Sequence, residues 1–97
     1  MATAGSETLN SATYTTLFDP SASGSVTTVA VWILDSVSEE VHVHVSNLHA
    51  SGDVGMRLLP GKVEYFTIYP RGLGLVKAIC STSTPVVYYS VVSKKLD

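Results

Sequence analysis

The chain has 97 residues, enough for one domain with its own hydrophobic core and too few for a second domain. Only 14% of its residues are charged, against roughly 25% in an average soluble protein, so its surface is unusually neutral. The net charge is -2 and the six basic residues are scattered, so the chain lacks the basic patch of a nucleic-acid-binding protein. No apolar run approaches the roughly 18 residues that a membrane-spanning helix needs.

The amino-terminal segment from Met1 to Ala12 is small and polar, with Leu9 as the residue to bury. Such a segment does not offset its own ordering entropy, so we predict a flexible arm. The segment also lacks the basic and apolar regions of a signal peptide, which indicates synthesis in the cytoplasm.

Residues 13–97 are predicted to form one domain of short strands, the first from Tyr14 to Phe18. The strongest predicted strand, Val26 to Leu34, is apolar on both faces. One face carries Val29, Val31 and Ile33, and the other carries Val26, Ala30, Trp32 and Leu34. A strand of this kind is either central and covered on both sides, or its outer face meets another subunit.

Later in the chain, Val41-His42-Val43-His44-Val45 alternates strictly, which predicts a strand with its valines inward and both histidines outward. Further strands are predicted at Met56–Leu59, Val63–Tyr69, Leu75–Cys80 and Val86–Val92. Pro60-Gly61 suits the two central positions of a type II turn. In the last strand, Tyr88 and Tyr89 point to opposite faces.

No stretch shows the 3.6-residue apolar period of a helix. The sequence therefore predicts an all-β protein, an antiparallel β-sandwich or small barrel of six to seven short strands. The predicted organisation is a flexible arm over residues 1–12 and one sandwich domain over residues 13–97.

Residue types for catalysis are present, but not in a catalytic pattern. The Gly-x-Ser-x-Gly motif is absent, and the aspartates stand beside turns or at the carboxyl end. We therefore predict that the chain is not an enzyme and has no catalytic residue and no cofactor. Cys80 has no partner for an internal disulfide and lies in an apolar run, so we predict a small buried side chain.

The histidines at positions 42 and 44 are candidates for a metal site. Two residues apart on a strand, His42 and His44 project from one face about 7 Å apart, and three copies around a threefold axis could surround one ion. His49 is close enough in sequence to approach them. The alternative is that both histidines are solvent-facing or interface residues, and we assign no metal ligand to the chain.

Aromatic side chains offer a second candidate site. Trp32 and the tyrosines could stack on sugar rings, although Tyr88 and Tyr89 lie on opposite sides of their strand. Core packing and subunit contact are the preferred interpretation of these residues.

The order of features from position 41 onward resembles that of small β-sandwich virion proteins of tailed bacteriophages, of the head decoration or cement type. The stretches that carry the resemblance are Val41–Asn47, Arg57–Gly61, Tyr65–Ile68, Arg71–Leu73 and Val86–Val91. The region in which they lie, from position 41 to position 91, covers roughly half the chain, as a pattern of strand, Pro-Gly turn and strand.

This resemblance implies a non-enzymatic structural protein that binds the major capsid protein from outside and stabilises the shell. It also implies a homo-oligomer, with a trimer favoured, located in the virion, whose amino-terminal arm reaches neighbouring capsid subunits. Neither nucleic acid nor membrane is an expected partner. The residues predicted to lie in interfaces are Leu9, Tyr14, Trp32, His42 and His44.

Two alternatives stay open at this point. One is a carbohydrate-binding or other ligand-binding β-sandwich module that uses Trp32 and the tyrosines. The other is a metal-centred tail or fibre component built on His42 and His44.

Overall fold

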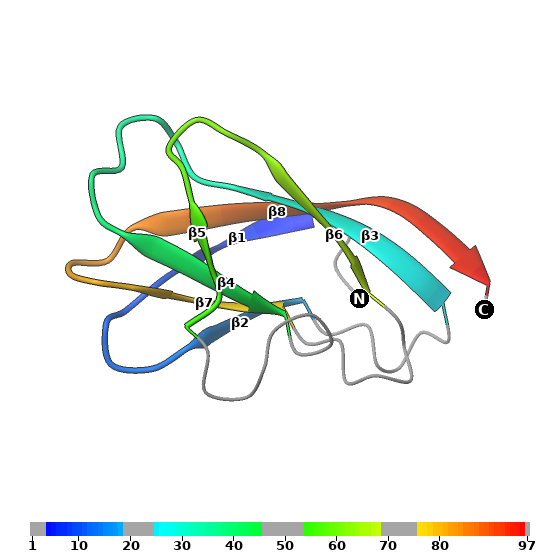
Figure 1. Ribbon diagram of the computed structural model, residues 1–97, viewed down its shortest axis with the longest axis horizontal. Helices are drawn as coiled ribbons and strands as arrows, with labels where there is room; N and C mark the ends of the chain where they lie inside the picture. Colours follow the sequence, from blue (N-terminus) through cyan, green and yellow to red (C-terminus); the bar gives the residue numbers. More distant parts are fainter. Residues whose placement is uncertain (1–3, 19–24, 46–53, 69–75, 97) are drawn as a thin grey trace.

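The structure, a computed structural model, describes residues 4–18, 25–45, 54–68 and 76–96 (Figure 1). This part of the chain contains eight strands and no helix. The strands are β1 (Ala4–Thr8), β2 (Thr15–Phe18), β3 (Ser25–Trp32), β4 (Val41–Val45), β5 (Met56–Leu58), β6 (Glu64–Ile68), β7 (Val76–Cys80) and β8 (Val86–Leu96). No helix long and apolar enough to cross a membrane is present in the described ranges.

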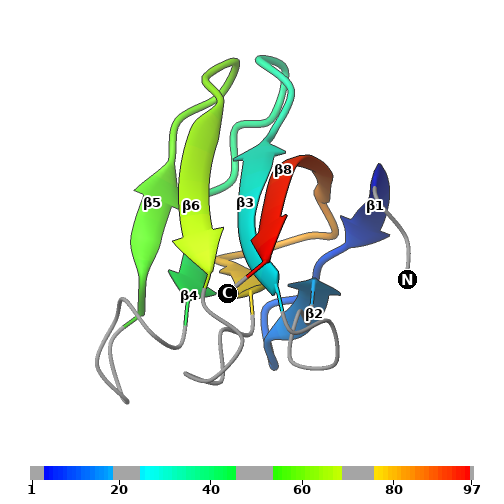
Figure 2. The same ribbon diagram turned by 90° about the vertical axis from the view of Figure 1, so that its right-hand side faces the viewer.

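The strands form two four-stranded antiparallel sheets, and the predicted β-sandwich is confirmed. The described residues form eight strands rather than the predicted six to seven, because the amino-terminal segment adds β1. Sheet A has the order β1-β8-β3-β6, and sheet B has the order β2-β7-β4-β5. Every connection except β4 to β5 crosses from one sheet to the other, which is the strand order of an eight-stranded jelly roll. Figure 2 shows β5 and β6 at one lateral edge of the sandwich and β1 and β2 at the other.

The core lies between the two sheets and takes one face of each long strand. Val29, Val31 and Ile33 are completely buried, as the alternation in their segment predicts. From sheet B, the three valines of β4 are equally buried. Phe18 and Tyr89 meet across the two layers with ring centroids 6.5 Å apart, so the sheets are joined by aromatic as well as aliphatic contacts.

The amino-terminal segment that we predicted to be a flexible arm forms a strand over Ala4–Thr8. This strand, β1, pairs with β8 in an unbroken register from Ala4 opposite Ser90 to Thr8 opposite Val86. Leu9 follows it into the core with 1% of its surface exposed. Backbone hydrogen bonds to β8 and one buried leucine order a segment whose other side chains carry no strand pattern. Residues 1–3 lie outside the described ranges.

The remaining strands begin or end within a few residues of their predicted positions. The largest difference is β8, which continues to Leu96 because its last residues pair with the start of β3, with Leu96 opposite Ser25. The type II turn at Pro60-Gly61 is confirmed: the Lys62 N–H donates to the Leu59 carbonyl at 3.1 Å, and Gly61 has φ of +77°. The predicted loops and turns over residues 19–24, 46–53 and 69–75, with His49 among them, lie outside the described residues.

Candidate functional site

The outer face of sheet A is the surface with the most unusual composition. Alternation along each strand and the cross-strand register place one set of side chains on the side opposite the core. The part of this surface that we call the neutral face comprises Ala4, Ser6, Thr8, Thr28, Ala30, Trp32, Tyr65, Thr67, Val86, Tyr88 and Ser90. Beyond it the two central strands continue, with Val26 of β3 opposite Lys95 of β8 in register.

None of the residues of the neutral face is charged. The charged residues that belong to its two edge strands, Glu7 and Glu64, stand in register with the core residues Val87 and Val31, so they lie on the inner side of the sheet. Outer faces of antiparallel sandwiches are ordinarily polar and solvated. Eleven outward-facing residues without a charge therefore differ from the usual outer face of a sandwich, and this difference requires an explanation.

Aromatic rings occupy the centre of the neutral face. Trp32 of β3 and Tyr88 of β8 are directly opposite in register, and their rings stack with centroids 5.9 Å apart and an interplanar angle of 14°. Tyr65 of β6 is 63% exposed, while Ala30 opposite it is only 4% exposed. Ala30 is thus covered on its outer side by its neighbours, and the exposed part of the centre is aromatic.

Apart from the indole N–H of Trp32, the polar side-chain groups of the neutral face are hydroxyls. Two of them, Thr28 and Thr67, are cross-strand partners whose hydroxyl oxygens lie 3.3 Å apart in a hydrogen bond. Because hydroxyls that bond to each other need few water molecules, this row is less costly to remove from water than a row of charged side chains.

The outer face of sheet B has the opposite character, and we call it the polar face. It comprises Thr16, His42, His44, Arg57, Lys77 and Ile79. Arg57 and Ile79 flank His42 in register, and Lys77 is opposite His44. The residues of the neutral face on sheet A are therefore uncharged, whereas the polar face of sheet B carries cationic side chains.

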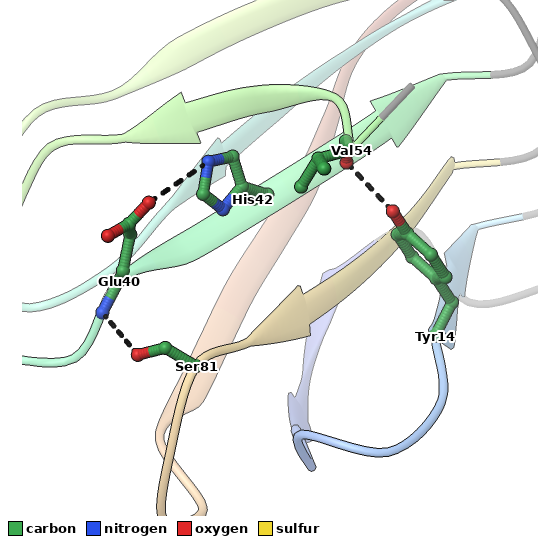
Figure 3. Close-up of polar contacts among 5 residues, drawn as sticks. All are labelled: Tyr14, Glu40, His42, Val54 and Ser81. Atoms are coloured by element: carbon green, nitrogen blue, oxygen red, sulfur yellow. Dashed lines mark hydrogen bonds and ion pairs between the residues drawn. The ribbon is translucent and has the colours of Figure 1, made fainter. Parts of the chain in front are cut away.

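His42 is the half-buried member of the histidine pair. Its Nε2 lies 3.4 Å from the Glu40 carboxylate (Figure 3). The Glu40 backbone N–H in turn donates a hydrogen bond to the Ser81 hydroxyl oxygen at 3.2 Å. This arrangement ties the start of β4 to the end of β7.

His44 lies on the outer face of sheet B, as the alternation predicts, but it is only 6% exposed and so does not face solvent in the single chain. The Tyr14 ring meets its imidazole edge-on at a centroid distance of 6.0 Å. Gly55 also passes close to the His44 backbone. The alternation places His44 on the outer face correctly, but the segments before β2 and β5 cover it, and local sequence does not reveal that cover.

Within the described ranges, a metal site on His42 and His44 would need ligands from more than one chain. No group of three or more histidine, cysteine, aspartate or glutamate side chains comes together there. His44 is buried beneath Tyr14, so it is not available to a threefold axis in the way the strand pattern suggests.

Tyr14 and Leu9, two of the residues predicted to lie in interfaces, make contacts within the chain. The Tyr14 hydroxyl donates to the Val54 carbonyl at 2.9 Å (Figure 3), and the Lys77 Nζ lies 4.7 Å from the centre of the Tyr14 ring. Leu9 belongs to the core. Of the predicted interface residues, Trp32 is the one that lies on the neutral face.

Cys80 is buried, as predicted. Burial raises the pKa of its thiol, and the negative charge of Glu39 raises it further. Its Sγ donates to the Ser83 carbonyl at 3.6 Å. A thiol with these surroundings is a packed side chain rather than an activated nucleophile.

Trp32 was predictable from the sequence as an interface residue, but the group of uncharged residues around it was not. That surface joins side chains from β1, β8, β3 and β6, which are neighbours only through the jelly-roll order. The low overall charge was the available signal, but it does not say where the neutral residues gather. No model of a protein family matches the chain, and no curated protein matches it, so the neutral face is the main observation that a function has to explain.

Proposed function

We propose that the chain is a non-enzymatic structural protein of a virion, which binds the capsid shell through the neutral face and stabilises it. The observation that carries the proposal is the absence of charge around an exposed aromatic centre on sheet A. The centres of protein interfaces are depleted in charged residues and enriched in tyrosine and tryptophan. The partner is then the major capsid protein, and the location is the virion.

The fold agrees with this proposal without establishing it. Eight-stranded jelly rolls occur in viral capsid proteins and also in lectins, and a fold of this kind serves many functions. The neutral face is what favours a macromolecular partner, because an exposed apolar and aromatic patch on a small domain is typical of an interaction surface. Homo-oligomerisation, with a trimer favoured, stays a prediction, since the structure describes one chain.

The second candidate function is a carbohydrate-binding module, and the stacked pair of Trp32 and Tyr88 is the observation in its favour. Sugar recognition also relies on carboxylate, amide or guanidinium groups that hold the sugar hydroxyls in fixed geometry. Such groups are missing among the residues that define the neutral face. Glycan-array binding that disappears in a folded Trp32→Ala protein would favour this candidate over a capsid partner.

Co-sedimentation with virus particles tests the proposed function. Density-gradient-purified particles that lack this protein are mixed with the wild-type chain and with two lysine variants. Tyr65→Lys places a charge on the exposed rim of the aromatic centre, and Thr16→Lys places the same charge at an exposed position of sheet B. We expect the wild-type and Thr16→Lys proteins to sediment with the particles and Tyr65→Lys to lose at least about tenfold in affinity, since interfacial charges are costly to desolvate.

The matched variants separate the possible failures. If the wild-type chain stays in the supernatant, the virion proposal is contradicted. If both lysine variants sediment as well as the wild type, the shell is bound through another surface, and the role of the neutral face is contradicted.

A further inference from the structure

The sandwich has four lateral edge strands, β1 and β6 in sheet A and β2 and β5 in sheet B. An edge strand exposes backbone N–H and C=O groups that can pair with another strand, so proteins ordinarily protect such edges. Short length, bulges and charged side chains are the usual means of protection.

Three of these edges carry such protection. Strand β5 has three residues and includes Arg57. Strand β2 has an irregular register between Thr16 and Phe18. Strand β6 begins at Glu64, whose carboxylate lies 3.7 Å from the Lys62 ammonium.

Strand β1 is neither short nor bulged, and none of the ion pairs among the described residues stands at its end. It has five residues in continuous register with β8, and four of its five residues are exposed. Its one charged residue, Glu7, stands opposite the core residue Val87 and so lies on the inner side of the sheet, as Glu64 of β6 does. This inward charge is the one form of protection that the strand carries. Figure 2 shows no described element of sheet A beyond β1.

One hydrogen bond fixes the direction of the backbone groups along this edge. The Leu9 N–H donates to the Pro85 carbonyl at 2.9 Å, directly after Thr8 pairs with Val86. In an antiparallel ladder, residues alternate between bonding to their partner strand and facing away from it. Gly5 and Glu7 therefore direct their backbone groups toward β8, whereas those of Ala4, Ser6 and Thr8 form the free edge.

We propose that β1 binds β1 of a second copy of this chain, antiparallel and centred on Ser6, to form one continuous sheet across a twofold axis. An antiparallel strand is its own complement under twofold symmetry. In this register Ser6 faces Ser6 and Ala4 faces Thr8, so every outward backbone group of the strand has a partner. Glu7 faces Gly5, which has neither charge nor side chain.

Neighbouring registers are less favourable for specific reasons. Centring the pair on Glu7 would place two carboxylates directly opposite each other, and like charges at that position are destabilising. Centring it on Gly5 would leave the outward groups of Thr8 without a partner from the strand. Charge and hydrogen bonding thus select the pairing centred on Ser6.

The pairing would place two neutral faces side by side. A twofold axis perpendicular to the sheet keeps both outer faces on the same side, so the dimer would present a surface twice as wide. The inference concerns the edge of the sheet rather than its face, and it stands whether or not the proposed capsid function is correct.

Sedimentation equilibrium of the full chain over a range of concentrations tests the pairing, with two substitutions at one position. Ser6→Pro removes the outward N–H at the centre of the pair, where proline is compatible with an edge strand because that N–H is not used by β8. Ser6→Ala keeps the backbone groups and is the matched control. We expect dimers for the wild type and Ser6→Ala, and monomers for Ser6→Pro. At dilutions where the wild type is also monomeric, all three proteins should have the same unfolding midpoint.

Amide hydrogen exchange of the wild-type protein gives an independent readout if Ser6→Pro fails to fold. We expect the amides of Ala4, Ser6 and Thr8 to exchange more slowly at concentrations where dimers form. A wild-type chain that remains monomeric would overturn the inference. A dimer that persists in folded Ser6→Pro would also overturn the inference. The same holds for a dimer that Tyr65→Lys abolishes, if the amides of Ala4, Ser6 and Thr8 show no protection in the wild-type dimer.

Capsid binding separates this inference from the proposed function. A monomeric Ser6→Pro protein that still sediments with particles would leave both proposals standing. A dimeric wild type that ignores the particles would contradict the capsid proposal alone.

Discussion

At the scale of single residues, Gly55 shows how closely the segment before β5 lies against β4. Its φ is +105°, a conformation that side chains disfavour. A Cβ at this position would also overlap with the backbone carbonyl of Val43, a fully buried residue at the centre of β4. The same segment presents the Val54 carbonyl to the Tyr14 hydroxyl. The cover over His44 therefore depends on a residue without a side chain.

Replacing Gly55 by alanine tests this close approach. We expect Gly55→Ala to lower the free energy of unfolding by about 3 kcal/mol, because backbone strain and overlap act together. The control is Gly61→Ala, which has a similar positive φ but meets only the Asp35 side chain at 3.2 Å. That variant should cost about 1 kcal/mol. Urea unfolding measures both, and equal losses would show that overlap with β4 contributes nothing.

At the scale of elements, β1 is the strand that local sequence could not predict. The other strands were predictable because their apolar residues recur with period two, as in β4, or fill both faces, as in β3. In β1 the side chains are small and mostly exposed, and its order comes from pairing with β8, more than 70 residues later in the chain. Long-range pairing of this kind has no local signature.

Truncation of Leu9 tests whether this segment is a structural strand or an arm. Leu9→Ala removes a side chain that is 1% exposed, and we expect a loss of about 3 kcal/mol in unfolding free energy with faster exchange of the β1 amides. The control is Leu34→Ala, at a leucine that is 48% exposed. It should change stability by no more than about 0.5 kcal/mol. A negligible effect of Leu9→Ala would restore the flexible arm that the sequence suggested.

At the scale of the whole molecule, the two outer faces divide the chemistry of the surface. The polar face carries Lys77, Arg57 and His42, with His42 in contact with the Glu40 carboxylate, and the residues of the neutral face carry no charge. The sequence predicted the overall neutrality and the outward position of Trp32. It could not predict the segregation of charge, because that follows from which strands are neighbours in the two sheets.

The central claim is that the neutral face binds the capsid shell, and hydroxyl-radical footprinting of the protein, free and bound to virus particles, tests it most directly. The oxidation rate of each aromatic side chain measures how exposed that side chain is. We expect oxidation of Trp32, Tyr65 and Tyr88 to fall at least several-fold on binding, since all three lie on the neutral face. Tyr14, on the side of sheet B, is the internal control and should be oxidised at an unchanged rate. Protection of Tyr14 with unchanged oxidation of Tyr65 would place the partner on the opposite sheet and contradict the account.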